Sequence, residues 1–258
     1  MTTPLSLRVV EAELRIYRRT WRGSVFSSFL SPILYLLAMG VGLGTLVDAN
    51  LPAGFEDATY LAFLAPGLLV ATAMQTGAGE GAWKVMAGIK WQQTWNARLA
   101  TPIGIGSLTV GHLLWSALRV LIVSVSFAIV MVAFGITTIL QAIGTLLPAM
   151  LVGMAMASMT TAFTSRLEDQ AGLPMFFRFV VIPMFLFSGV FFPVTQLPGW
   201  LQPVAYATPV FHGVELARSI ALGIPPAVDP WISVAYLTAW IVVGGLLVVA
   251  PLRRRLTP

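Results

Sequence analysis

Residues 120–165 contain no charged side chain, and this uncharged run limits the possible folds more than any other feature of the sequence. Because an α-helix rises about 1.5 Å per residue, one helix of this length would be about twice as long as the ~30 Å hydrocarbon core of a bilayer is thick. The chain must therefore turn within the run, and residues 135–138, beginning at Gly135, offer the best turn. The run predicts two neighbouring membrane-spanning helices, at residues 103–134 and 140–163.

The chain as a whole has the composition of an integral membrane protein. Of its 258 residues, 57% are hydrophobic and 10% are charged, and the mean hydropathy is +0.86. A soluble domain carries about 25% charged residues, so this chain lacks the charges to cover a surface exposed to water. Since about 20 apolar residues span a bilayer, we predict a single-domain, all-α membrane protein with six transmembrane helices. The other four spans are residues 24–47, 58–79, 172–192 and 230–252.

Two further segments predict helices that do not cross the membrane. Residues 193–222 are apolar yet rich in proline, which favours short re-entrant helices in the outer leaflet, where protein buries the broken backbone. Residues 1–22 favour an interfacial amphipathic helix lying along the membrane, although a basic leader that only orients the chain has a similar composition. Its apolar face holds Leu7, Val10, Leu14, Tyr17 and Trp21, and its polar face holds Arg8, Glu11, Arg15, Arg19 and Arg22.

The loops on the two sides of the predicted membrane differ in charge. Six spans place both termini on one side, and the opposite loops are mainly acidic, with Arg218 as their one basic residue. Because Lys and Arg are enriched in cytoplasmic loops, we predict that both termini are cytoplasmic. The basic residues on that side are Arg8, Arg15, Arg18, Arg19, Arg22, Lys84, Lys90, Arg98, Arg166, Arg253, Arg254 and Arg255.

A polar, tryptophan-rich segment at residues 83–101 interrupts the apolar sequence on the predicted cytoplasmic side. Trp91, Trp95 and Leu99 are spaced four apart, so on a helix they share one face, and Pro102 ends the segment. One interpretation is that this face fills a groove on a soluble partner, with Lys90, Gln92, Asn96 and Arg98 at the rim. The other is that the tryptophans anchor a surface helix among the lipid head groups.

The sequence lacks the residues that would let the chain supply its own energy. Neither Lys84 nor Lys90 stands in a G-x-x-x-x-G-K-[ST] sequence, so the chain has no P-loop for ATP. No acidic residue lies in the middle of a span, which argues against proton or sodium coupling. With no Cys and two His residues, a Cys- or His-based metal site is also disfavoured. By elimination, a separate ATPase is the best source of work, and the chain itself is not predicted to be an enzyme.

Four charged or titratable residues near or within the apolar stretches receive structural interpretations, and functional roles stay open. Glu80, at the end of the second span, can lie among the lipid head groups. Arg119, within the third span, can pair with Glu80 or with a carbonyl at a helix end. Arg178 can reach the membrane surface through its long side chain. His212 lies in an apolar, proline-rich stretch and is interpreted as a hydrogen-bonded structural residue.

Five stretches together resemble the type-2 ABC (ABC-2) exporter permeases, and within them the nodulation-factor exporter (NodJ-like) branch, with the daunorubicin-resistance-type permeases as close relatives. The likeness covers nearly the whole chain, and the motif that begins at Phe187 is its most specific part. The stretches are SPILYLLAMGVGLG at residues 31–44, TYLAFLAPG at 59–67, QTWNARLATP at 93–102, FSGVFFPVTQLP at 187–198 and TPVFHGVELAR at 208–218.

The resemblance implies a half-transporter in the cytoplasmic (inner) membrane of a bacterium. Two permease subunits, identical or paralogous, would pair, and two cytosolic ABC ATPase subunits, which bind ATP and Mg²⁺, would dock beneath them. This chain would then hold no cofactor. Its substrate would be amphipathic (a glycolipid, lipooligosaccharide or hydrophobic drug) and would be exported. The alternative is a stand-alone ion-coupled carrier or channel for a small hydrophobic solute, which predicts no ATPase partner.

The resemblance also implies roles for individual residues. In the coupling helix at residues 83–101, contact with the ATPase would come from Lys90, Trp91, Gln92, Trp95, Arg98 and Leu99. The translocation path and permease interface would include Tyr35, Met39, Gly40, Gly44, Phe187, Phe191 and Phe192. An outer-leaflet gate would be formed by His212, Glu215 and Arg218.

Overall fold

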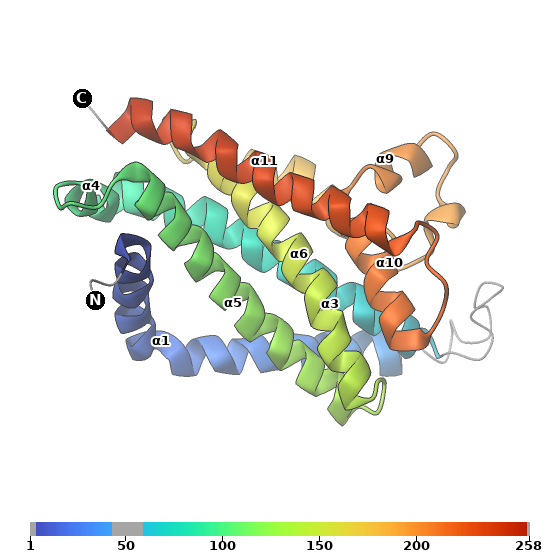
Figure 1. Ribbon diagram of the computed structural model, residues 1–258. Helices are drawn as coiled ribbons and strands as arrows, with labels where there is room; N and C mark the ends of the chain where they lie inside the picture. The colour runs from blue at the N-terminus through green and yellow to red at the C-terminus, as the bar shows by residue number, and fades with distance from the viewer. Residues whose placement is uncertain (1–3, 43–58, 257–258) are drawn as a thin grey trace.

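The structure is a computed structural model, and it describes residues 4–42 and 59–256. Every regular element within those ranges is helical, and Figure 1 shows the long helices running along one general direction. Five helices there are long and apolar enough to cross a membrane, and a further apolar stretch, Gly172–Phe187, is shorter. The prediction of an all-α membrane protein is confirmed. The long helices are α1 (Leu5–Leu36), α3 (Tyr60–Gly79), α5 (Ile105–Ala133), α6 (Ile139–Thr164) and α11 (Pro230–Leu256).

Helix α1 contains both the segment predicted to lie along the membrane and most of the first predicted span. Figure 1 shows α1 bending sharply, so that its N-terminal part runs across the direction of the other long helices. Gly23 and Ser24 form a Gly/Ser pair, which is one of the usual causes of a helix kink. The hydroxyls of Ser27 and Ser28 donate to the Ser24 carbonyl oxygen at 2.9 and 2.8 Å. Such bonds often bend helices, so this part of α1 contains two features that favour a bend.

Turn chemistry separates α5 from α6 inside the uncharged run. Gly135 has φ +70°, a left-handed conformation that glycine adopts at little cost. Thr138 then caps α6, because its hydroxyl accepts from the Gln141 backbone N–H while the Gln141 side chain accepts from the Thr138 backbone N–H. The two long helices are therefore antiparallel neighbours, joined by a short connection.

The fifth predicted span, residues 172–192, is shorter and less regular than predicted. The helix stops at Ser188 because Gly189 adopts φ +82° and Pro193 follows soon after. The segment consists of α7 (Gly172–Phe176), η5 (Phe177–Val181) and α8 (Ile182–Phe187). Short helices then follow before α11: η6 (Val194–Gln196), α9 (Gln202–Tyr206) and α10 (Pro209–Leu222).

Helix α3 is buried along most of its length and packs closely on α6. At the crossing point, a Cβ built on Gly77 would lie only 1.9 Å from the Gly153 carbonyl oxygen. Small residues at such a point let two membrane helices approach closely, which is the main source of packing energy between helices in lipid. Gly77 is therefore a position where no side chain fits without moving a backbone.

We expect a Gly77→Ala protein to lose about 1–3 kcal/mol of unfolding free energy, because the added methyl group forces α3 and α6 apart. Thermal unfolding of the purified protein in detergent measures the change. The matched control is Gly106→Ala in α5, where nothing lies within 4 Å of the added Cβ. Equal losses in the two proteins would contradict this account of the helix crossing.

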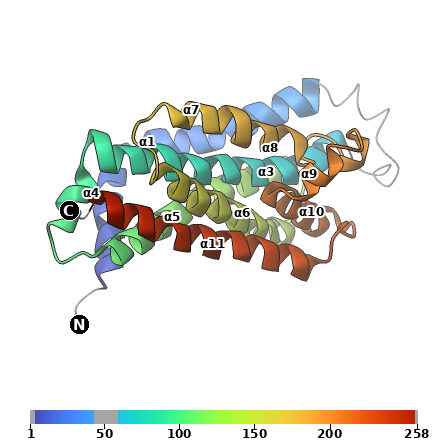
Figure 2. The ribbon, with the colours of Figure 1, turned by 90° about the horizontal axis from the view of Figure 1, so that it is seen from above.

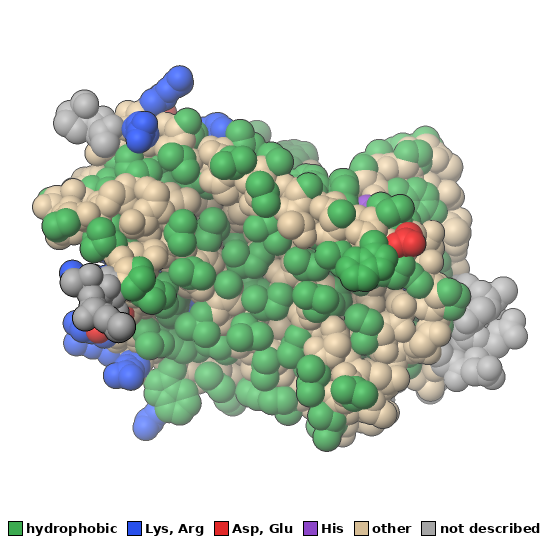
Figure 3. Space-filling model, viewed as in Figure 1, with side chains coloured by type: hydrophobic (Ala, Val, Ile, Leu, Met, Phe, Trp, Pro, Cys, Tyr) green, Lys and Arg blue, Asp and Glu red, His purple; other side chains and the backbone are tan. Residues whose placement is uncertain are grey.

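The two ends of the molecule differ in chemistry. Figure 3 shows Lys and Arg side chains gathered at one end, where Figures 1 and 2 place both termini and α4 (Thr94–Leu99). We call this the basic end. Figure 2 places α9 and α10 at the opposite end, which we call the proline-rich end. Each end holds one of the two regions that the sequence singled out as functional.

Candidate functional site

The polar segment at the basic end does not form one helix, so the prediction of a single helix at residues 83–101 is wrong. Helix α3 continues through two π-helical turns, η3 (Glu80–Lys84) and η4 (Ala87–Trp91), and ends there. Gln93 has φ +51°, a left-handed conformation, and the short helix α4 begins at Thr94. The chain reverses at Gln92 and Gln93 and folds back on the bundle.

The reversal separates the two tryptophans that were predicted to share a face. Trp95 is only 2% exposed, and its ring covers Gly88, where an added Cβ would lie 2.4 Å from the ring. Its ring also meets the His112 ring edge-on, with centroids 5.4 Å apart. Trp91, in contrast, is 49% exposed. Burial of the Trp95 indole thus explains the reversal, and Trp95 holds α4 in place instead of facing a partner.

A buried carboxylate joins three elements behind this segment. Glu13 of α1 is 6% exposed and forms ion pairs with Lys84 of η3 and Arg98 of α4, the latter at 2.7 Å. Leu99 packs against the same small core as Val9. Arg98 and Leu99 therefore face inward, and the prediction that they contact a partner does not fit this arrangement. We call Glu13, Lys84 and Arg98 the Glu13 hub.

Three of the six predicted docking residues are exposed. They are Lys90, Trp91 and Gln92, and together with Gln93 we call them the tip. The Trp91 ring stacks on Trp83, which is 43% exposed, with centroids 6.5 Å apart. Lys90 Nζ donates to the Glu168 carbonyl oxygen at 3.1 Å. The tip is thus an aromatic and polar surface with a rigid support.

A second ion pair lies deeper in the bundle. Glu80 Oε1 accepts from Arg119 Nε at 3.2 Å, and Glu80 Oε2 accepts from Trp115 Nε1 at 3.1 Å. Arg119 Nη1 also donates to Ser24 Oγ at 2.7 Å. The predicted pairing of Arg119 with Glu80 is confirmed. The pair joins α1, η3 and α5, so both ion-pair networks connect the extension of α3 to α1.

Sequence reasoning missed Glu13, because it considered which face of the leader meets the membrane and not which face packs on the protein. Leu7 and Trp21, predicted to lie on the apolar face, are each 47% exposed, whereas Val9 is 1% exposed. Helical spacing selected the face that Leu7 and Trp21 share, but a different face, which includes Val9, packs on the rest of the protein. An available signal was that Val9 and Glu13 are four residues apart, which places the acidic side chain on the same face as an apolar one.

Some of the residues predicted to line a translocation path are packed inside the protein, and others are exposed. Met39 and Phe191 pack against one core cluster with Tyr60, whose hydroxyl donates to the Phe191 carbonyl oxygen at 3.3 Å. Tyr35 and Phe187 are 44% and 38% exposed. Of the others, Phe192 packs near Val194, Gly40 lies in the π-helical turn η1 (Leu37–Val41), and Gly44 lies outside the described residues.

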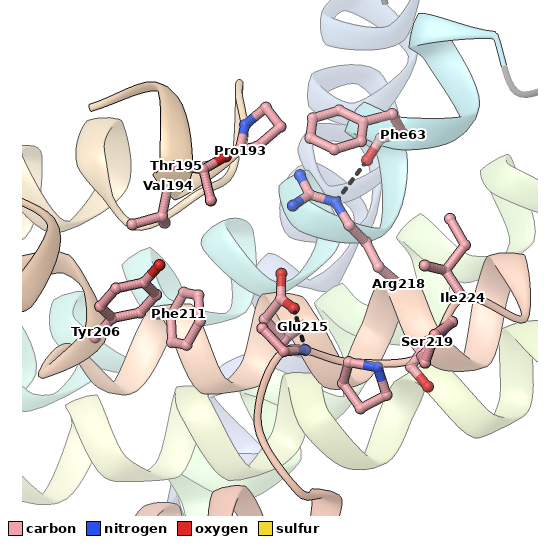
Figure 4. A pocket seen from close by; sticks show the side chains of 13 residues that line it. Phe63, Pro193, Val194, Thr195, Tyr206, Phe211, Glu215, Arg218, Ser219 and Ile224 are labelled. Carbon is pink, nitrogen blue, oxygen red and sulfur yellow. Dashed lines mark hydrogen bonds between the residues drawn. The ribbon is translucent and has the colours of Figure 1, made fainter. Parts of the chain in front are cut away.

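A cavity of about 270 Å³ lies at the proline-rich end, between α10 and the loop after α8. Figure 4 shows Glu215 and Arg218 among its lining residues, beside Phe63 and Phe211. Arg218 is 4% exposed, and its guanidinium donates to the carbonyl oxygens of Phe63 (3.0 Å) and Val190 (2.8 Å). The guanidinium carbon also lies 3.6 Å from the centre of the Phe63 ring. One side chain therefore ties α10 to the start of α3 and to the loop.

The third residue of the predicted gate, His212, lies outside this cavity. Its Nδ1 is 3.1 Å from Ser233 Oγ, and its ring lies against Tyr236 of α11. Burial lowers the pKa of His212 below its usual value. The structure thus brings two of the three predicted gate residues together, and His212 is a hydrogen-bonded residue of the α10–α11 contact.

Comparison with known proteins places these features in one family. The family model for the ABC-2 type transporter matches residues 7–222, which include the tip, the Glu13 hub and α10. The chain belongs to the ABC-2 type transporter family.

Curated relatives of this ABC-2 protein match along most of its length. Nodulation protein J of Rhizobium meliloti is 30% identical over 242 residues, covering 94% of this chain and 90% of the relative. Nodulation protein J of Rhizobium leguminosarum bv. viciae is 31% identical over 250 residues, covering 94% of each. The inner membrane transport permease YadH of Escherichia coli is 21% identical over 215 residues, covering 82% and 80%. This ABC-2 chain is accordingly a multi-pass membrane permease subunit of an ABC transporter, a type of subunit that works with an ABC ATPase.

Proposed function

We propose that this chain is the permease of an ATP-driven exporter that moves an amphipathic substrate out across the cytoplasmic membrane of a bacterium. Two copies, or one copy and a paralogue, pair in the membrane, and two ATPase subunits dock at the basic end. Both termini then lie in the cytoplasm. The observation that carries the proposal is the tip, an exposed surface of aromatic and polar side chains at the end of the most buried of the long helices.

The chemistry of the tip suits a protein partner. Trp91 and Trp83 present two stacked indoles at 49% and 43% exposure, and Lys90 and Gln92 supply polar contacts beside them. Trp is among the residues that most often dominate binding energy in protein interfaces. Lys90 and Trp91 of the tip are also the last two residues of η4, so a force applied there acts directly on the helix that begins with α3.

The two ion-pair networks supply a route from the tip to the rest of the permease. When the ATPase subunits close on ATP, the tip moves with them, and α4 moves as one body with it because Trp95 is buried behind it. The Glu13 hub then passes the movement to the N-terminal part of α1, and the Glu80–Arg119 pair passes it to α5. Binding shifts a conformation only if the partner prefers one of the two states, so a stiff connection of this kind is what coupling requires.

Amphipathic substrates fit the exposed surface of the bundle. Apolar side chains on α1 and α8, including Leu34, Tyr35 and Phe187, remain exposed in the single chain, at 56%, 44% and 38%. Such faces suit lipid chains or a second permease subunit, and they do not suit a small hydrophilic solute. Glycolipids, lipooligosaccharides and hydrophobic drugs share the required apolar part.

A Trp91→Asp protein is expected to retain roughly 30-fold less ATPase than the unaltered chain, because loss of an interface hot spot costs about 2 kcal/mol or more. The test is affinity purification of the tagged full chain from native membranes, followed by identification of the co-purified ATPase and assay of ATP hydrolysis. Asp at the exposed tip leaves the fold intact, which size-exclusion chromatography checks.

The matched control is Trp200→Asp, which changes an exposed tryptophan (76%, against 49% for Trp91) at the proline-rich end. It is expected to retain the ATPase in full. The proposal fails if the Trp91 variant binds the ATPase as well as the control does, or if no ATPase co-purifies with the unaltered chain.

A further inference from the structure

A polar cavity lies among three of the helices that are apolar enough to cross the membrane. Its volume is about 300 Å³, and it is lined by α1, α3 with the start of η3, and α5. Eight of its eleven lining residues carry a hydroxyl, an amide or a charge. A polar group in a bilayer costs free energy unless it has a hydrogen-bonding partner, and polar residues there commonly mark a binding site or pathway.

The polar side chains come from matching faces of two helices. Ser27 and Ser31 are four residues apart on α1, and Thr72 and Thr76 are four apart on α3, with Gln75 beside them. The hydroxyls of Ser27, Thr72 and Thr76 donate to carbonyl oxygens of their own helices, at 2.9, 2.7 and 2.9 Å. Their oxygens keep lone pairs that can accept hydrogen bonds from a ligand.

Two side chains in the cavity have hydrogen-bonding capacity that the bundle leaves unused. The side chains of Ser31 and Gln75 are exposed and make no hydrogen bond with any other residue in the described part of the chain. The Gln75 amide offers two donors and an acceptor, and the Ser31 hydroxyl offers one donor and an acceptor. The cavity can therefore donate to a ligand as well as accept from it.

The charged groups at one side of the cavity cancel each other. Arg119 and Glu80 form the ion pair described above, and the two carboxylate oxygens accept from Arg119 and Trp115. The cavity thus offers many hydrogen bonds with no net charge. That combination suits an uncharged group rich in hydroxyls. An anion would meet Glu80 and a cation would meet Arg119, in each case a charge of its own sign. An apolar ring would leave the polar groups of the cavity unpaired.

An apolar strip begins beside the cavity. Leu30 and Leu34 lie on the same face of α1 as Ser27 and Ser31, at 39% and 56% exposure. A molecule with a polar head in the cavity could lay its hydrocarbon chain along these two leucines. The volume of about 300 Å³ is at the lower end of the ~300–1,000 Å³ found for small-molecule sites, which fits a head group and excludes a whole lipid.

We propose that this cavity binds the uncharged, saccharide-type head group of the transported substrate, while its hydrocarbon chain lies along Leu30 and Leu34. The proposal rests on the proposed function, since it selects one class among the amphipathic substrates considered there. Gln75 and Ser31 are its specificity-determining residues, because they have unused donors.

The test uses the full chain in lipid nanodiscs and three probes with the same twelve-carbon tail. Radiolabelled dodecyl maltoside has an uncharged disaccharide head with many hydroxyls, octaethylene glycol monododecyl ether has ether oxygens and a single terminal hydroxyl, and dodecyl phosphate is anionic. Below its micelle concentration, dodecyl maltoside is expected to bind saturably and about tenfold or more tightly than the other two. Gln75→Leu is expected to weaken maltoside binding about tenfold, which corresponds to one or two lost hydrogen bonds.

Gln196→Leu, at an exposed glutamine of η6, is the matched control and should leave maltoside binding unchanged. If Gln75→Leu fails to give a monodisperse protein, Ser31→Ala takes its place, with an expected loss of about threefold. Equal binding of the three probes, preference for dodecyl phosphate, or no effect of either variant would overturn the proposal. Such a result, with the ATPase still co-purifying, would rule out this binding site and leave the exporter proposal standing. Absence of a co-purifying ATPase would instead rule out the exporter proposal.

Discussion

A Glu13→Lys protein is expected to lose most of its ATP-driven transport and about 3–5 kcal/mol of unfolding free energy. The substitution replaces the buried carboxylate of the Glu13 hub by a third cation beside Lys84 and Arg98. Removing one partner of a buried ion pair leaves an uncompensated charge, which is what costs this much. Thermal unfolding of the purified chain gives the stability, and ATP hydrolysis by the complex with its ATPase gives the coupling.

Two further variants distinguish loss of the Glu13 hub from a general effect of added positive charge on stability. Glu11→Lys changes an exposed glutamate whose partner, Arg15, is on the same helix, so a change of about 0.5 kcal/mol or less is expected. Glu13→Lys combined with Arg98→Glu restores an opposite-charge pair between α1 and α4 and should recover a large part of the stability. If the double variant is no better than Glu13→Lys alone, the pairing of α1 with α4 is not what Glu13 contributes.

An Arg218→Met protein is expected to lose about 2–4 kcal/mol of unfolding free energy, with the damage concentrated at the proline-rich end. The methionine fills much of the space but leaves the Phe63 and Val190 carbonyl oxygens without their donor. Hydrogen exchange followed by mass spectrometry is the suitable measurement, because it reports each segment separately. Faster exchange is expected around residues 60–64 and 188–194, with little change at the basic end.

Arg218→Lys tests whether geometry or charge is responsible. A lysine keeps the positive charge but lacks the planar fork that reaches two carbonyl oxygens in different directions, so only a small part of the loss should be recovered. Arg178→Met, at an exposed arginine of η5, removes the same charge and should have almost no effect. Full recovery by lysine would show that the two hydrogen bonds are not the source of the stability.

The spans were predictable from the sequence because hydrophobicity and charge act over whole segments. The run at residues 120–165 had to contain a turn, and the glycine at position 135 takes the left-handed conformation found there. The fifth span was harder, because its apolar residues continue beyond the point where the helix stops. There the conformation of Gly189, and not hydrophobicity, sets the end.

The coupling segment was predicted less well because its shape depends on contacts distant in sequence. Gln93 carries no local signal for a left-handed conformation, and helical spacing alone placed Trp91 and Trp95 on one face. The outcome depends on whether Trp95 can be buried, which requires Gly88 and His112 to be close to it. The Glu13 hub is similar, since nothing in the local sequence near Glu13 indicates Lys84 or Arg98 as partners.

The predicted gate residues also divide into those that local spacing brings together and one that a distant contact places elsewhere. Glu215 and Arg218, predicted from the family resemblance, are one helical turn apart on α10, and this spacing is enough to bring them together. His212 is also one turn from Glu215, but it meets Ser233 of α11 instead of the cavity. Packing across the bundle decides which of two neighbouring faces of α10 meets α11. The sequence pattern of α10 does not contain this information.

Site-specific crosslinking tests the central claim, that an ATPase docks on the tip, most directly. The chain contains no cysteine, so a single Gln92→Cys substitution gives one attachment point at the tip, and Gln196→Cys gives one at the proline-rich end. Each full-length protein is labelled with a photoactivated maleimide crosslinker in native membranes and the adducts are identified by mass spectrometry. An adduct between Cys at position 92 and an ABC ATPase, with none from position 196, is the predicted result. An ATPase adduct from position 196, or from neither position when the ATPase co-purifies, would contradict docking at the tip.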